Sequence, residues 1–307
     1  MASKQSGTKR LTDKQIRAIV AAIVAIACFI AYTISQRAEK EEIAAVEGIF
    51  TLHVIDVGNA DSLLLEQGET KVLIDAGERG DSKTVLRYLA DRGIRTLDLV
   101  IATHPHTDHM GGMADVLKNI EVKRFIQSYM PESATPTSDA YFDMLEMLDK
   151  KNIPVEEAKP GTKIQIGEAV MEILAPLSPD EEPNNMSVVT RVTFGKRRFL
   201  LMGDAEKTVE EQLLRSGAAL KADVIKLGHH GSRSSSSEAF IRKVDPTFAI
   251  MTCGAGNRYG HPHRETVALM EKLKIPAFRC DVEGCMQFTT DGDYLRVVTQ
   301  NGTEEAA

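Results

Sequence analysis

The sequence predicts an α/β protein, a four-layer α/β/β/α sandwich, preceded by one N-terminal transmembrane helix. In each half of the chain, short apolar β-strand patterns alternate with amphipathic helical patterns, which is typical of two covered sheets. Histidine and aspartate clusters follow the ends of the predicted strands. An uncharged apolar run near the N-terminus predicts the transmembrane helix.

The apolar run extends from Ala18 to Ile34 and, at about 17 residues, reaches the lower limit for spanning a bilayer. Basic residues precede it and mixed charges follow it, which predicts a cytoplasmic N-terminus and export of the rest. A cleaved signal peptide and a lipoprotein signal ending at Cys28 are the alternatives. We expect a single-pass protein of the cell membrane with an extracytoplasmic main domain. Its predicted parts are a basic cytoplasmic tail over 1–17, an anchor over 18–35, a linker over 36–48, the main domain over 49–300 and a disordered tail over 301–307.

The first half of the main domain opens with three short β-branched or apolar runs that predict a strand meander. A helix follows, because Val85, Leu86 and Leu89 have helical spacing and Gly93 provides a stop. The predicted strands are 50–57, 62–67, 71–77, 97–103 and 122–128, and the predicted helices are 82–93, 111–120 and 139–151.

The second half repeats the alternation with longer hairpin strands. The predicted strands are 163–167, 169–175, 187–195, 197–203, 222–228, 247–252, 278–280, 285–290 and 294–300, and the predicted helices are 206–217, 237–244 and 264–274.

Composition restricts the partners. The formal net charge of −7 and the absence of tryptophan argue against indiscriminate nucleic-acid binding over a broad basic or aromatic surface, although a local basic channel is compatible with both.

Cys280 and Cys285 flank a turn-like "DVEG", so they either pair as a disulfide or remain thiols. Lacking a Cys-x-x-Cys pair, the chain has no structural zinc pattern. His53 lies in an alternating strand and is expected to be a packing residue.

The stretch "ATHPHTDHMGG" contains three of the eight histidines of the chain around an aspartate. In an extended segment His104 and His106 project to the same side and can bind one ion. Asp108 and His109 come after the chain turns and can face a second ion. Imidazole and carboxylate groups are ligands for zinc, manganese or iron, so this pattern predicts a metal site.

Two further clusters follow predicted strands. Gly203-Asp204 ends "FLLMGDA", and His229-His230 ends "VIKLGHH". A carboxylate has two oxygens, so Asp204 can bridge two ions. The three clusters together favour a metal centre assembled from both halves of the chain.

This pattern resembles that of the metallo-β-lactamase superfamily. In more detail, "HVIDVGNADSLLL", "KVLIDAG", "NNMSVVTRVTFGKRRFLLMGDA", "VIKLGHHGSRSSSS" and "NRYGHPH" resemble the hydrolase domain of ComEC-type DNA-uptake proteins. The teichoic-acid phosphorylcholine esterases are similar as well. The resemblance covers about residues 49 to 298 and is more specific for the fold than for the substrate.

The resemblance implies two divalent ions, zinc or manganese. His104 and His106 would bind the first ion, Asp108 and His109 the second, and Asp204 would bridge them.

The adjacent histidines His229 and His230 leave two assignments open. We expect His229 to complete the second site and His230 to contact the substrate, although the sequence does not decide between them. Asp75 would orient a ligand, and His261 would donate a proton, with His263 the weaker candidate for that role.

The chain departs from the broad superfamily because no histidine lies between His109 and His229. Asn184 or Asn185 would supply an oxygen there, or water would fill the place. The first site is therefore expected to be weaker or to prefer manganese, and occupancy by one ion stays open.

Two adjacent cations would make hydroxide available near neutral pH, with Asp108, His230 and His261 as the catalytic side chains. Ser232 and Arg233 are candidate phosphate contacts, with Lys196 and Arg258 adding positive charge nearby, although the serine run also has capping-box spacing. The expected activity is that of a phosphodiesterase or nuclease. The alternatives are an esterase acting on cell-wall phosphorylcholine, another small ester or a lactone, and a non-catalytic binding module. The expected partners are the membrane, DNA or another phosphodiester, and a separate uptake channel, because one span cannot conduct a strand.

Overall fold

The computed structural model describes residues 47–131 and 134–307. The predicted cytoplasmic tail, the anchor over 18–35 and nearly all of the linker lie outside the described residues. Within the described part of the chain, no helix has both the length and the apolar character needed to cross a membrane.

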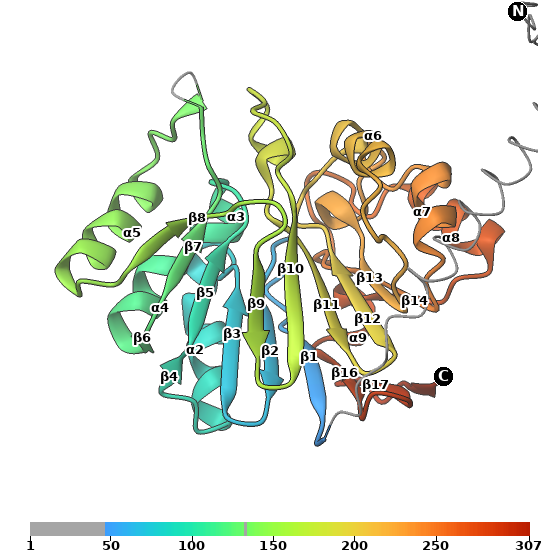
Figure 1. The fold of residues 1–307 in the computed structure, drawn as a ribbon, viewed down its shortest axis with the longest axis horizontal. Helices are drawn as coiled ribbons and strands as arrows, with labels where there is room; N and C mark the ends of the chain where they lie inside the picture. The colour runs from blue at the N-terminus through green and yellow to red at the C-terminus, as the bar shows by residue number, and fades with distance from the viewer. Residues whose placement is uncertain (1–46, 132–133) are drawn as a thin grey trace, which may run out of the picture. The chain divides into compact units, whose positions relative to one another are not determined.

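Two large sheets form the centre of the unit from Val46 to Ala307 (Figure 1). The first has nine strands in the order β18-β17-β16-β1-β2-β3-β5-β7-β8. Its strands are β1 (Phe50–Val54), β2 (Leu63–Gln67), β3 (Thr70–Ile74), β5 (Leu99–Ala102), β7 (Phe125–Gln127), β8 (Val155–Glu157), β16 (Met286–Thr290), β17 (Leu295–Thr299) and β18 (Glu304–Ala306).

The second sheet has seven strands in the order β15-β14-β13-β12-β11-β10-β9. Its strands are β9 (Lys163–Ile166), β10 (Ala169–Ala175), β11 (Val189–Phe194), β12 (Arg197–Leu201), β13 (Val224–Lys226), β14 (Phe248–Met251) and β15 (Ala277–Arg279). A separate short pair joins β4 (Thr96–Leu97) to β6 (Glu121–Val122).

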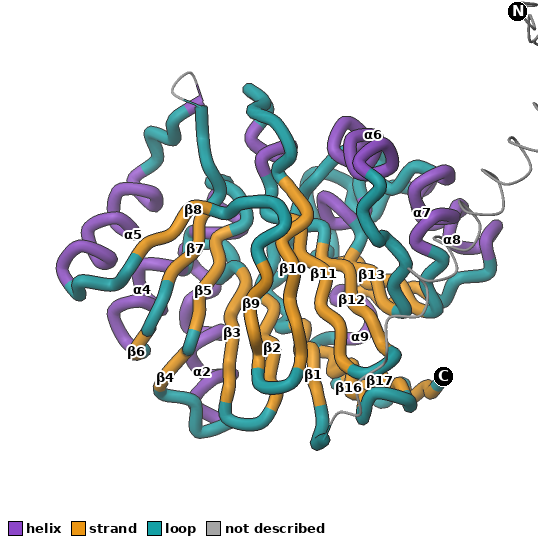
Figure 2. Tube along the Cα trace, viewed as in Figure 1, coloured by secondary structure: helices purple, strands orange, loops and turns teal. Residues whose placement is uncertain are grey.

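Tight hairpins connect β2 to β3, β9 to β10 and β11 to β12, and helices connect the parallel strands of both sheets. Figure 2 shows the helices on the outside of the strands. The helices are α2 (Ser82–Asp91), α3 (Thr107–Met110), α4 (Met113–Asn119), α5 (Asp139–Lys150), α6 (Lys207–Ser216), α7 (Glu238–Val244), α8 (Arg264–Leu273) and α9 (Cys280–Glu283).

Three buried apolar layers account for the sandwich. Phe50, Phe199 and Phe288 belong to the layer between the sheets. A second layer joins the first sheet to α2, α4 and α5, and a third joins the second sheet to α6, α7 and α8. Burial of these layers is the main stabilising contribution, and their order confirms the predicted α/β/β/α sandwich.

The C-terminal residues differ from the prediction. Strand β18 pairs with β17, and the Arg197 guanidinium donates to the Ala307 carbonyl oxygen at 2.7 Å. The predicted disordered tail over 301–307 is therefore wrong for 304–307. Its pairing groups are backbone atoms, which leave no side-chain signal in the sequence. The edge strand β8 was also missed, because its three side chains are exposed and leave no pattern of buried apolar residues in the sequence.

The cysteines in the described residues are free thiols. Cys280 is buried at the start of α9, and Cys285 lies beyond that helical turn. The disulfide alternative for Cys280 and Cys285 is therefore not found.

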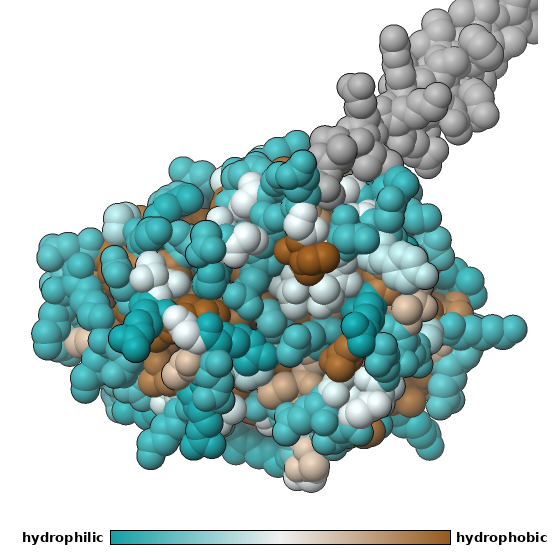
Figure 3. Space-filling view, turned by 90° about the horizontal axis from the view of Figure 1, so that it is seen from below, coloured by the Kyte–Doolittle hydropathy of each residue, from teal (hydrophilic) through white to brown (hydrophobic). Residues whose placement is uncertain are grey.

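The predicted metal-ligand segments meet at one end of the sandwich. The segments after β5, β12 and β13 lie at the end where α3 is found, whereas the β2–β3 and β9–β10 hairpins lie at the opposite end, the lower one in Figure 1. That lower end is largely hydrophilic, with scattered hydrophobic residues (Figure 3). The strand ends near α3 therefore form the candidate site.

Candidate functional site

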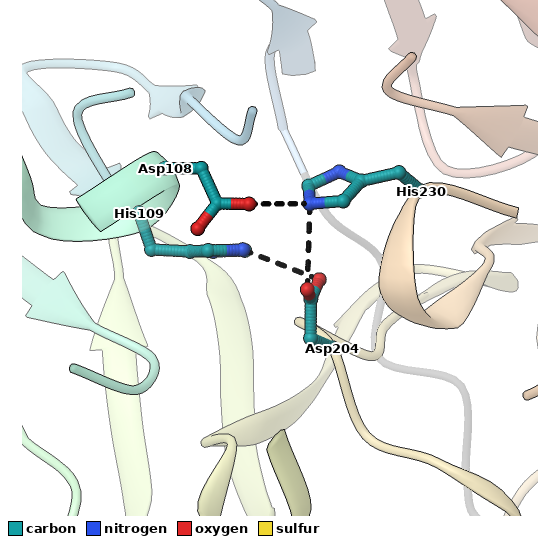
Figure 4. Close-up of side chains that lie close together, drawn as sticks. All are labelled: Asp108, His109, Asp204 and His230. Carbon is teal, nitrogen blue, oxygen red and sulfur yellow. Dashed lines mark hydrogen bonds and ion pairs between the residues drawn. The ribbon is translucent and has the colours of Figure 1, made fainter. Parts of the chain in front are cut away.

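Four side chains from both sheets converge at this end of the sandwich, and Figure 4 shows them facing one another. Helix α3, after β5, carries Asp108 and His109. The turn after β12 carries Asp204, and η4 (Gly228–Gly231), after β13, carries His230. Each has a ligand atom within 4.8 Å of the others, so the four can hold one metal ion. We call them the ligand cluster.

Asp204 lies at the centre of the ligand cluster. Its Oδ1 is 3.2 Å from His109 Nε2, and its Oδ2 is 3.3 Å from His230 Nε2. The same His230 nitrogen is 3.3 Å from Asp108 Oδ2. Asp204 therefore presents one oxygen to each imidazole (Figure 4).

Two buried atoms of the cluster lack hydrogen-bond partners. His109 Nε2 and Asp204 Oδ1 are close, but neither makes a hydrogen bond with the other or with another described residue. The two atoms form a 3.2 Å ion pair that requires a proton on His109, and a divalent cation held by them would take the place of that proton. The residues present therefore fit a divalent metal ion.

His104 and His106 lie next to the ligand cluster. His104 is buried, its Nε2 is 3.0 Å from His106 Nδ1, and its ring centroid is 4.1 Å from that of His109. The contact brings His104 Nε2 and His106 Nδ1 together, but the four-residue cluster does not include these two histidines.

The adjacent histidines have different surroundings from those predicted. His230 is fully buried in the cluster, whereas His229 is about a quarter exposed and its Nδ1 is 3.0 Å from Glu206 Oε1. Both residues have positive φ, 49° and 53°, so the backbone turns sharply and separates the two imidazoles. The four-residue cluster therefore includes His230, whereas His229, whose Nε2 is 3.8 Å from Asp204 Oδ2, lies outside it.

Asp75 fixes the orientation of His109. Its Oδ2 is 2.7 Å from His109 Nδ1, while the Thr103 amide and hydroxyl donate to its carboxylate at 2.8 and 2.6 Å. A carboxylate that engages Nδ1 leaves Nε2 available to a ligand, which is the role predicted for Asp75.

Sequence reasoning missed two buried charged residues beneath the ligand cluster. Lys226 Nζ is 2.8 Å from Asp61 Oδ2 and donates to the carbonyl oxygens of Gly203 and Leu227. Asp61 Oδ1 accepts from the Thr252 hydroxyl and lies 3.4 Å from His230 Nδ1. The sequence contained one signal of this pair: Lys226 lies inside the apolar strand "VIKLG", where residues are expected to be buried. A buried lysine is almost always paired with an opposite charge.

The charges in this region are mutually dependent. Burial alone would raise the pKa of Asp61 and of Asp204. Lys226 and His230 nevertheless hold the pKa of Asp61 below its usual value. His230 and His109 hold the pKa of Asp204 well below its usual value. Burial alone would lower the pKa of His109 and of His230. Asp204 and other carboxylates outweigh burial and raise both pKa values well above the usual value for histidine. Without an ion, both imidazoles therefore hold protons.

The ligand cluster borders a cavity of about 400 Å³. Among the predicted site residues, His106, Asn184, His229 and His261 line it together with three members of the cluster, Asp108, Asp204 and His230. The full lining is Asn59, Pro105, His106, Thr107, Asp108, Ser138, Asn184, Asp204, His229, His230, Tyr259 and His261.

Ser232, Arg233 and Asn185 are among the predicted residues that do not line this cavity. The Ser232 hydroxyl is occupied by Ser234, and the exposed Arg233 guanidinium is 3.8 Å from Glu265. Asn185 donates to Asp180 instead of facing the ligands. The predicted substrate contacts of Ser232 and Arg233 are thus not found at this cavity, because the serine-rich turn directs them elsewhere.

The comparisons with known proteins agree with this architecture. The Metallo-beta-lactamase superfamily profile matches residues 55–254. ComE operon protein 3 of Bacillus subtilis is 32% identical over 257 residues, 76% of this chain and 32% of that protein. Competence protein ComA of Neisseria gonorrhoeae is 28% identical over 270 residues, 87% of this chain and 35% of that protein. The chain thus spans about a third of these relatives. The crystal structure of CmlA, a diiron beta-hydroxylase from Streptomyces venezuelae, has a TM-score of 0.52 at 13% identity, over 78% of this chain and 54% of that one.

The first prediction concerns the buried ion pair. Lys226→Met or Asp61→Asn alone leaves an uncompensated buried charge and should lower the free energy of unfolding by about 3–5 kcal/mol. The double variant should lose less than the sum of the two single losses, by about 1 kcal/mol or more. Urea unfolding with a chelator present measures both. Lys123→Met, which breaks an exposed pair with Asp98, is the matched control. Strict additivity of the two losses would contradict a direct pairing.

The second prediction concerns pH. Because His109 and His230 hold protons in the ion-free cluster, zinc must displace them, and its affinity should rise with pH by up to about tenfold per unit for each proton released. Below the raised pKa values the affinity falls. Calorimetry in buffers of different ionisation enthalpy counts the released protons, and His230→Gln should reduce that count by about one. A pH-independent affinity would mean that zinc binds elsewhere.

Proposed function

Because this chain belongs to the metallo-beta-lactamase superfamily, we propose that it is a metal-dependent phosphodiesterase that acts on nucleic acid. The single observation that carries the proposal is the ligand cluster: Asp204, placed between two imidazoles with unsatisfied ligand atoms, borders a cavity that can admit a substrate. His104 and His106 would hold the other ion. When bound, the two divalent ions, zinc or manganese, supply Lewis acidity and an activated water.

We propose that His261 donates a proton to the leaving group. It lines the cavity, and its ring centroid is 5.1 Å from that of His229. Burial and the neighbouring histidines lower the pKa of His261 to about 4, so its imidazole is neutral at pH 7. An anionic phosphate nearby would raise that pKa, which favours proton transfer from His261 only when substrate is present.

The relatives support a nucleic-acid substrate, because two of them are named as competence proteins or products of a com operon. We propose that the catalytic unit lies outside the cytoplasm, anchored by residues 18–35. We also propose a separate DNA-uptake channel as a partner; the chain itself spans about a third of these relatives.

One observation favours a second candidate, an esterase acting on phosphorylcholine or another small ester. Among the described residues, no lysine or arginine lines the cavity. A small or weakly charged ester needs no such group, whereas a polyanion normally gains affinity from one.

The third prediction separates these candidates. The purified full chain, loaded with manganese or zinc, should cleave end-labelled DNA, and Asp204→Ala should lower kcat/KM at least about 10³-fold, as expected for loss of a central charged group. Asp293→Ala, at an exposed surface pair with Lys196, is the control and should be unaffected. Turnover of a chromogenic phosphodiester or of phosphorylcholine esters without DNA cleavage would instead support the esterase.

The fourth prediction concerns His261. His261→Gln should lower kcat by about 10²–10⁴-fold on diesters with a poor leaving group, with a much smaller loss on nitrophenyl esters, whose leaving group needs no proton. His263→Gln, whose ring accepts from the Arg233 amide, is the matched control. An equal loss on both substrates would remove His261 from proton transfer.

A further inference from the structure

Tyr259 at the cavity has an exposed aromatic ring that the proposed mechanism does not use. It lies in the loop between β14 and α8, lines the cavity that the ligand cluster borders, and is 51% exposed. Exposed aromatic surface is unfavourable in water, and at the wall of a cavity it is typical of a binding surface.

The ring is held in a defined orientation. It is nearly parallel to that of His261, with an interplanar angle of 23° and 5.6 Å between centroids. Asn257 Oδ1 accepts from the backbone amides of both Tyr259 and His261, at 3.2 and 2.9 Å. A ring fixed in this way loses little conformational entropy when a ligand stacks on it.

Arg258 places a cation over part of this ring. Its guanidinium lies 4.8 Å from the centroid of the Tyr259 ring and donates to the Tyr259 hydroxyl at 2.6 Å. Arg258 is exposed and makes no ion pair within 4.0 Å among the described residues. The cavity, which has no basic side chain in its described lining, therefore has a positive charge next to its aromatic wall.

We propose that Tyr259 and Arg258 form a subsite for a nucleotide next to the scissile bond, with the base stacked on the aromatic group and the adjoining phosphate on Arg258. This subsite rests on the proposed function and narrows its substrate to single-stranded nucleic acid, because a paired base cannot leave its own stack without cost. Stacking of one base is worth about 1–3 kcal/mol, or roughly 5- to 150-fold in affinity.

The test uses the full chain with its metals removed by a chelator, so that binding is measured without cleavage. The probe is a short single-stranded oligonucleotide carrying 2-aminopurine, whose fluorescence falls when it stacks on an aromatic ring. The chain has no tryptophan to interfere with this signal. We expect quenching with the parent chain and with Tyr259→Phe, and neither quenching nor full affinity with Tyr259→Ala.

The matched controls lie far from the cavity lining. Tyr294→Ala removes a tyrosine that is 69% exposed in the β16–β17 hairpin and should change nothing. Arg258→Gln should make the slope of log affinity against log salt concentration shallower by about 0.7, the value for one phosphate contact on a single strand. Arg215→Gln on α6 should leave that slope unchanged.

Quenching that survives Tyr259→Ala, or no binding by the parent chain, would overturn the subsite. A Tyr259-dependent signal from a chain that cleaves no DNA when loaded with metal would contradict the phosphodiesterase and leave the subsite intact. DNA cleavage by the metal-loaded chain without a Tyr259-dependent signal would contradict the subsite and leave the phosphodiesterase intact.

Discussion

Three carboxylates, Asp61, Asp75 and Asp204, are buried at one end of the sandwich, and the rest of the site depends on compensating their charge. An unpaired buried carboxylate costs several kcal/mol, so each needs a cation or donors of its own. Lys226 compensates Asp61, and Thr103 and His109 compensate Asp75. For Asp204, the partners are the imidazoles of His109 and His230. The arrangement fixes the positions of ligand atoms before any ion is bound.

The sandwich makes this arrangement possible because it brings strand ends from both halves to one end. β5 and α3 belong to the first half, whereas β12 and β13 belong to the second. Neither half contains a complete set of ligands. The apolar layer between the sheets therefore sets the spacing of the cluster as directly as the ligands themselves do.

Most of the strands and helices and the histidine motif could be predicted because apolar periodicity and His/Asp spacing are local properties of the sequence, whereas the exposed strands β8 and β18 carry no such pattern. The placement of His230 rather than His229 in the ligand cluster could not be predicted, because it depends on two consecutive positive φ angles. Lys226 was missed because its compensating carboxylate, Asp61, is distant in sequence. Ser232 and Arg233 were predicted as phosphate contacts from their residue types. In the structure the Ser232 hydroxyl accepts from the Ser234 hydroxyl, and the Arg233 guanidinium lies near Glu265.

The contact of Asp108 with His230 joins residues that are 122 positions apart. An ion held by both would act as a reversible cross-link between the two halves. Partly open forms, in which the sheets have separated, would lose that ion entirely. Its binding free energy would therefore add to the cooperativity of the whole unit, and loss of the ion would allow the halves to fluctuate more independently.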